Sequence, residues 1–130
     1  MCFLLARGVG IPLVYFSFID GARIQSAIYF YQATFGAHCS YRHDLSTNVL
    51  LVLQRSDFGL AFINKSADWI VWDSCKINGV KRGTWKELSF KFKVEISEGK
   101  DGNTWISKWG NDKSCFSIGP REALFLLHEQ

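Results

Sequence analysis

Apolar positions between residues 22 and 37 repeat with the period of an α-helix that buries one face. The i, i+3, i+4, i+7 and i+11 positions of this stripe are Ile24, Ala27, Ile28, Tyr31 and Phe35. Asp20 can accept backbone N–H bonds at the start of the helix. Gly36 can take the left-handed backbone conformation that ends a helix. The pattern therefore predicts one amphipathic helix near the start of the chain.

Strand patterns lie on both sides of this helix. Apolar runs or alternating positions predict strands at residues 13–19, 38–43, 48–53 and 60–64. The segment 38–43 alternates only weakly, as an edge strand does, and Asp57-Phe58-Gly59 has the composition of a hairpin turn. The predicted order is β-α-β-β-β over about residues 11–65.

In the second half of the chain, the pattern of apolar positions predicts strands but no helix. Alternation over 88–96 predicts one half-exposed strand whose apolar face is Leu88, Phe90, Phe92, Val94 and Ile96. Other strands are predicted at 69–72, 105–109, 114–118 and 123–128. The connection 97–104 contains two glycines and an asparagine, which disfavour a helix.

The amino-acid sequence of the predicted helix also resembles that of a known family. Ala27-Ile28-Tyr29-Phe30-Tyr31, followed by Phe35-Gly36-Ala37, resembles the helix signature of the vicinal oxygen chelate superfamily. Its members include the glyoxalase, bleomycin-resistance and extradiol dioxygenase relatives. Near the other end, Trp109-Gly110, Gly119-Pro120 and residues 124–129 resemble the ending of the same family.

The resemblance implies an α+β fold in which βαβββ modules form a curved, mixed sheet shaped like a cup. The whole chain, 1–130, is then one domain. Its first module spans about 11–65. A second, degenerate module spans about 86–130 and lacks a clear helix.

The positions at which family enzymes hold a divalent metal are occupied here by poor ligands. Residues 13–16 are Leu, Val, Tyr and Phe, and Asn64 carries the one side-chain oxygen in 60–64. No histidine lies in 88–92, and Leu126 stands where the last carboxylate belongs. We therefore expect neither a metal nor another cofactor. The alternative is a metal-dependent lyase, isomerase or dioxygenase that uses ligands such as His38, His43, Glu122 and His128.

Aromatic residues make up 15% of the chain and include five tryptophans. Metal-free relatives bind planar molecules in an aromatic cleft, so the resemblance implies a small apolar or planar ligand. The candidate ligand-binding residues are Tyr15, Phe62, Asn64, Trp69, Trp72, Phe90, Phe92, Trp105 and Trp109. Alternatively the tryptophans cover the core or an interface, and the protein acts only through protein contacts. Whether the chain is an enzyme stays open at this point.

Charge and the remaining motifs exclude several classes. The net charge is +3, and the basic residues form no cluster of the kind that binds nucleic acid. No nucleophile-elbow, P-loop or dinucleotide-binding motif occurs.

The apolar stretch 1–19 is interrupted by Gly8, Gly10 and Pro12, which argues against a membrane helix and favours a cytoplasmic location. The sparse spacing of Cys2, Cys39, Cys75 and Cys115 favours small buried side chains in a reducing compartment, and we do not expect Cys39 or Cys75 to be activated.

The missing second helix has a consequence for assembly. The apolar face of 88–96, with Trp105 and Trp109 nearby, would be uncovered in a single chain. A two-fold homodimer that covers this face is therefore expected.

Overall fold

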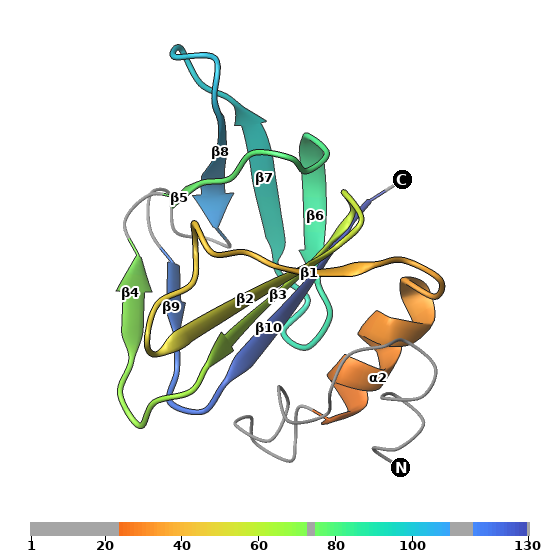
Figure 1. Cartoon of the computed structure of the whole chain (residues 1–130), viewed down its shortest axis with the longest axis vertical. Coiled ribbons are helices and arrows are strands. Elements are labelled where there is room, and N and C mark those ends of the chain that lie inside the picture. The colour runs from red at the N-terminus through yellow and green to blue at the C-terminus, as the bar shows by residue number, and fades with distance from the viewer. Residues whose placement is uncertain (1–23, 73–74, 110–115, 130) are drawn as a thin grey trace.

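The computed structural model describes residues 24–72, 75–109 and 116–129 (Figure 1). One helix, α2 (Ile24–Ala33), precedes the strands. The strands are β1 (Cys39–Tyr41), β2 (Leu50–Arg55), β3 (Gly59–Asn64), β4 (Ile70–Trp72), β5 (Cys75–Lys76), β6 (Gly83–Glu87), β7 (Lys93–Glu98), β8 (Thr104–Trp109), β9 (Phe116–Ile118) and β10 (Ala123–His128). The helix described here is too short to cross a membrane.

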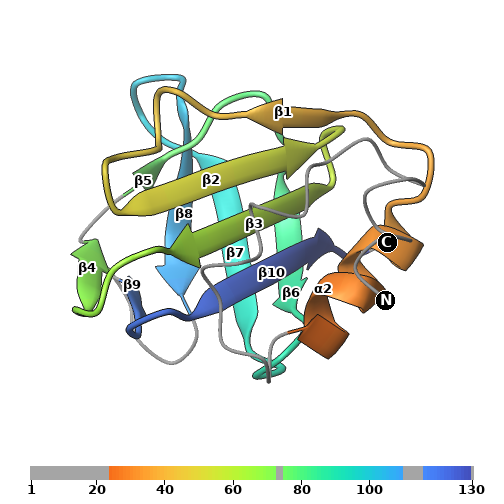
Figure 2. The same ribbon diagram turned by 60° about the horizontal axis from the view of Figure 1, so that its bottom comes forward.

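Eight of the strands form one curled sheet with the order β1-β2-β3-β10-β6-β7-β8-β5, and β4 and β9 form a separate pair. In Figure 2, β2, β3 and β10 cross obliquely over β6, β7 and β8, so the sheet has the shape of a half-barrel. The α+β class and the curved sheet agree with the sequence. Every pairing among the described strands is antiparallel, whereas a mixed sheet was expected. The predicted strand 13–19 lies outside the described residues, so the two-module arrangement remains a prediction.

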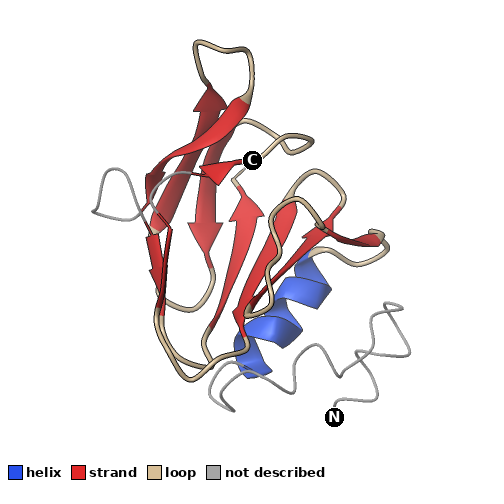
Figure 3. Cartoon of the chain, turned by 60° about the vertical axis from the view of Figure 1, so that its left-hand side comes forward, coloured by secondary structure: helices blue, strands red, loops and turns tan. Residues whose placement is uncertain are grey.

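Both faces of β2, β3 and β10 are buried, which explains their nearly continuous apolar sequences. On the concave side, a core cluster contains Leu45, Leu50, Val52, Leu60, Phe62, Ile77, Trp85, Val94, Ile96, Ile118, Leu124 and Leu126. On the other side, a second cluster joins the sheet to α2 (Figure 3) and contains Ala27, Phe30, Tyr31, Leu51, Leu53, Ala61, Ile63, Ala123 and Phe125. Neighbouring residues of one strand alternate between the two clusters.

The helix ends earlier than predicted, at Ala33, and its buried face is rotated. The buried residues of this segment are Ser26, Ala27, Phe30, Tyr31 and Thr34, which again follow helical spacing. The side chain of Phe35, expected on the buried stripe, is 81% exposed because it follows the last helical residue. Gly36, three residues after the end of the helix, has the predicted left-handed backbone conformation, with a φ of +83°.

The predicted strand 88–96 is confirmed for residues 93–96 and wrong for 88–92, where a turn interrupts it. The carboxylate of Glu87 accepts hydrogen bonds from the backbone N–H groups of Ser89 and Phe90, which bends the chain at this point. Lys91 then has a positive φ of 63°. Strand β7 starts only at Lys93. The apolar face expected to be exposed is therefore divided between a turn and a buried strand.

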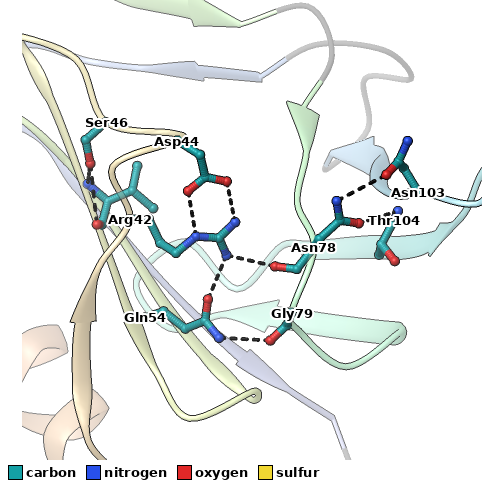
Figure 4. A network of polar contacts seen from close by, with 9 residues as sticks. Arg42, Asp44, Ser46, Gln54, Asn78, Gly79, Asn103 and Thr104 are labelled. Carbon is teal, nitrogen blue, oxygen red and sulfur yellow. Dashed lines mark hydrogen bonds and ion pairs between the residues drawn. The ribbon is translucent and has the colours of Figure 1, made fainter.

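A polar network links the segments that follow β1 and β5, the two outermost strands of the curled sheet (Figure 4). Arg42, which follows β1, forms a bidentate ion pair with Asp44 at 2.6 and 2.8 Å. Its Nη1 also donates to Gln54 on β2 at 2.7 Å and to the carbonyl of Asn78, just after β5, at 3.0 Å. Gln54 donates in turn to the carbonyl of Gly79 at 2.9 Å. Hydrogen bonds of side chains thus connect the β1 edge of the sheet to its β5 edge, although these two strands do not pair with each other.

Candidate functional site

The outer face of the β4–β9 pair carries the most exposed tryptophan among the residues whose burial is described. Trp69 and Val71 are each 65% exposed, whereas Ile70 between them packs against the concave core. Val71 pairs with Ser117, which is also exposed. We call the surface formed by Trp69, Val71 and Ser117 the Trp69 platform. Val71 and Ser117 lie on the two paired strands, and Trp69 directly precedes β4.

Gly119 determines where the indole of Trp69 lies. The register of β4 with β9 places Ile70 opposite Ile118, so Trp69 and Gly119 are the next pair along. A β-carbon at Gly119 would lie 3.5 Å from Cη2 of the indole. The ring therefore packs over the backbone of a residue that has no side chain, as aromatic residues do across from a glycine in a sheet.

Asn64 holds the two segments of the platform together. Its Nδ2 donates to the carbonyls of Asp68 at 2.8 Å, Ile118 at 3.2 Å and Gly119 at 2.9 Å. Its Oδ1 accepts hydrogen bonds from the N–H and the hydroxyl of Ser66, both at 2.8 Å. The side chain is fully buried, and both its donors and its acceptor are in use. Asn64 was expected to bind ligand directly, but here it orders the loop that carries Trp69.

A carboxylate lies at the edge of the platform. Oε1 of Glu122 accepts a hydrogen bond from the N–H of Gly119 at 3.1 Å. Oε2 of Glu122 would lie 3.3 Å from a β-carbon at Gly119, at the same point that Trp69 reaches. The platform thus combines an exposed aromatic ring with one carboxylate at its edge.

The other predicted ligand-binding residues do not gather at this place. Phe62 is fully buried in the concave core. Phe90 and Phe92 stack on each other in the turn before β7, with ring centroids 6.5 Å apart, and Phe90 is 47% exposed. Trp105 donates from Nε1 to Oδ1 of Asp101 at 3.1 Å in the β7–β8 loop.

The structure does not describe the side chains of three predicted ligand-binding residues. Tyr15 lies outside the described residues. Trp72 and Trp109 are placed only by their backbones, which pair with Phe116 and Val94 respectively. Phe62, expected to line an aromatic cleft in the cup, belongs instead to the packed core cluster on the concave side.

The alternative metal ligands are dispersed. His38 and His43 are exposed, and the ring of His43 contacts that of Tyr41 edge-on at 4.4 Å. Nε2 of His128 lies 3.0 Å from the carbonyl of Arg82. Among the described residues, no three His, Cys, Asp or Glu side chains lie close enough together to hold a metal ion.

Two features of the site were missed in the sequence. Val71 and Ser117 were not chosen, although the out-in-out order of Trp69, Ile70 and Val71 is a short strand pattern that indicates an exposed face. The role of Gly119 depends on its pairing with a residue fifty positions away in the chain, and no local signal indicates it.

The chain was compared with known families, curated proteins and solved structures. No protein-family model matches it. No curated protein sequence matches it either. A similar solved structure is described as "Crystal structure of AmyP in complex with maltose". The similarity covers 69% of this chain and 16% of that chain, at 16% identity and a TM-score of 0.44, and carries no functional argument.

Proposed function

We propose that this domain binds a planar, largely apolar small molecule without a metal ion or other cofactor, and that the ligand stacks on the Trp69 platform. The observation that carries the proposal is an indole that is 65% exposed and yet fixed in place. A tryptophan brings a large apolar surface whose exposure to water is unfavourable. A ligand that covers the ring would remove this surface from water.

The hydrogen bonds of Asn64 support the proposal because they order the site before any ligand arrives. The loop that carries Trp69 is tied to the segment 118–119 by the buried amide. Binding to an ordered surface loses less conformational entropy than binding to a mobile one. The exposed side chains that define the platform, Trp69, Val71 and Ser117, are uncharged, which favours a ligand recognised by shape and stacking.

Ligand binding can be tested by calorimetry with a panel of planar aromatic compounds, comparing wild type with Trp69→Ala. Loss of a stacking contact worth about 1.5 kcal/mol weakens binding by about tenfold. Trp105→Ala is the matched control, because Trp105 lies on strand β8 and is not part of the Trp69 platform. The proposal is wrong if a ligand binds wild type and Trp69→Ala equally well, or if Trp105→Ala loses the same affinity.

The alternative class is a metal-dependent lyase, isomerase or dioxygenase. It would require a metal-ligating group of the kind that the described residues do not bring together. Elemental analysis of the purified full chain distinguishes the two. A stoichiometric divalent metal, together with an activity that a chelator abolishes, would favour the enzyme.

A non-catalytic interaction protein is the remaining alternative, in which the platform contacts another macromolecule or a second copy of the chain. Trp69 and Val71 provide an exposed apolar face for either. A homodimer in the cytoplasm stays part of our proposal. The surface from which it was expected is different, however, since Val94 and Ile96 are buried in the core of one chain.

A further inference from the structure

Arg55, at the end of β2, is a buried cation. Its side chain is 0% exposed. Nε donates to Oγ1 of Thr34 at 2.7 Å, and Nη2 donates to the carbonyl of Thr34 at 3.1 Å. Nη1 has no hydrogen-bond partner among the described residues. A buried guanidinium is stable only when its charge and its donors are matched, so a donor left over at this place points to an absent anion.

The residue directly opposite Arg55 in the sheet is Cys39. The register of β1 with β2 pairs the two residues, and residues directly opposite each other project to the same face. Cys39 packs against the cluster between the sheet and α2, which is the face where Arg55 meets Thr34. The thiol is free and half-buried on an edge strand, which leaves it within reach of a small molecule.

Among the described residues, no carboxylate is found that offsets the charge of Arg55. The guanidinium carbon lies 4.6 Å above the ring centre of Tyr31. Burial lowers the pKa of Arg55, and the groups whose charge opposes this change are Tyr31 and Cys39. Burial raises the pKa of Cys39, while the charge of Arg55 acts in the opposite direction. The two side chains therefore interact electrostatically, and an anion at position 39 would be favourable.

We propose that Cys39 is a modification site at which hydrogen peroxide converts the thiol to a sulfinate, and that the guanidinium of Arg55 holds this anion. In the first step the sulfur attacks one peroxide oxygen, the O–O bond breaks, and sulfenic acid and water form. A second peroxide adds another oxygen to the sulfur and is itself reduced to water. The sulfinic acid then releases its proton, and the resulting negative charge lies next to Nη1 of Arg55.

The selectivity of this site comes from the product and not from a reactive thiol. Because burial raises the pKa of Cys39, little thiolate is present at neutral pH, and oxidation becomes faster as the pH rises. Once formed, the sulfinate supplies the counter-ion that Arg55 lacks among the described side chains. Oxidation of a cysteine in an apolar core would destabilise the fold, whereas here it should stabilise it.

The chemical test uses a full-length chain in which Cys2, Cys75 and Cys115 are replaced by serine. Peroxide treatment followed by peptide mass spectrometry should find two added oxygen atoms on Cys39. The melting temperature should rise by a few degrees after this treatment. In the same background with Arg55→Met, oxidation should lower it. A Cys39 that stays a thiol at high peroxide, or a fall in melting temperature with Arg55 present, overturns the proposal.

A second test needs no oxidant and leaves Arg55 unchanged. Cys39→Asp places a permanent carboxylate opposite Arg55, and Cys39→Ser is its neutral reference. Cys39→Asp should melt a few degrees higher than Cys39→Ser at neutral pH. Ser40→Asp, which adds the same charge at an exposed neighbouring position, should leave the melting temperature nearly unchanged. The proposal is also overturned if Cys39→Asp is less stable than Cys39→Ser.

Discussion

The indole of Trp69 lies over the backbone of Gly119, where a β-carbon would come within 3.5 Å of the ring. Gly119→Val should therefore displace the indole, because the branched side chain needs the space that the ring occupies. Fluorotryptophan NMR, with the Trp69 signal assigned from Trp69→Phe, should show a shifted resonance. Ser117→Val, on the neighbouring exposed position, is the control and should shift it less. An unchanged Trp69 resonance in Gly119→Val would show that the contact is not maintained in solution.

Asn64 should be one of the most sensitive polar residues of the fold. Asn64→Leu has nearly the same volume, but it removes the acceptor of the Ser66 N–H and one donor each from the carbonyls of Asp68, Ile118 and Gly119. We expect a loss of about 2–4 kcal/mol in the free energy of unfolding, measured by urea denaturation. The matched control is Asn48→Leu at an exposed position, which should change stability by less than about 0.5 kcal/mol. Equal effects of the two substitutions would contradict the role given to Asn64.

Glu87 is the second buried polar residue on which the fold depends. Besides the turn, its carboxylate accepts a hydrogen bond from the N–H of Phe125 on β10 at 2.8 Å. Glu87→Gln replaces one acceptor oxygen by a donor that faces other donors, so we expect a loss of about 2 kcal/mol in unfolding free energy. Glu98→Gln is the control, because the ion pair of Glu98 with Arg82 is exposed and should contribute less than about 1 kcal/mol.

The homodimer is best tested at side chains that are exposed in the structure. Val71→Glu and Phe90→Glu each add a charge to an apolar surface that remains accessible. Light scattering after size exclusion should show a dimer of the 14.8 kDa chain that one of these variants dissociates. Phe92→Glu is a poor choice, because Phe92 packs against the concave core and its substitution should destabilise the monomer. Monomeric wild type at micromolar concentration would end the dimer proposal.

The loop between β7 and β8 should respond to acid. Hydrogen bonds from Asn103 and Trp105 lower the pKa of Asp101 from 3.8 to about 2. Because the folded-state pKa lies below the unfolded value, the carboxylate stabilises the loop above pH 3.8, and this contribution is lost as the pH falls toward 2. The indole N–H signal of Trp105 in NMR spectra should shift in this window. Asp101→Asn should remove the transition, and a shift that persists in this variant would assign it to another group.

The hydrophobic pattern of the sequence predicted those elements that are determined by residues close together in the chain. Strand β10 occupies Ala123–His128, the bounds that its apolar run predicted, and the helix ends before Gly36 as expected. The start of the predicted strand 88–96 was wrong because the apolar–polar alternation continues through the turn. The turn is formed by the carboxylate of Glu87, which also accepts a hydrogen bond from Phe125, a residue far away in the sequence. Periodicity cannot detect such a contact.

The candidate site could be predicted only in part, for a related reason. Residue type identifies Phe62 and Trp69 equally as aromatic ligand-binding candidates, yet one is fully buried and the other is 65% exposed. The difference is set by which strand face each occupies, and this depends on pairing partners distant in the chain. The pairing of Cys39 with Arg55 likewise requires the register of two strands.

The position of β10 has a consequence for the way the protein is made. Strand β10 lies between β3 and β6, although it is the last of the described strands to be synthesised. Until residues 123–128 leave the ribosome, β3 and β6 both present backbone edges without their partner and apolar faces without their cover. The nascent chain therefore holds two incomplete halves, and translation must proceed past β10 before they can join into one core.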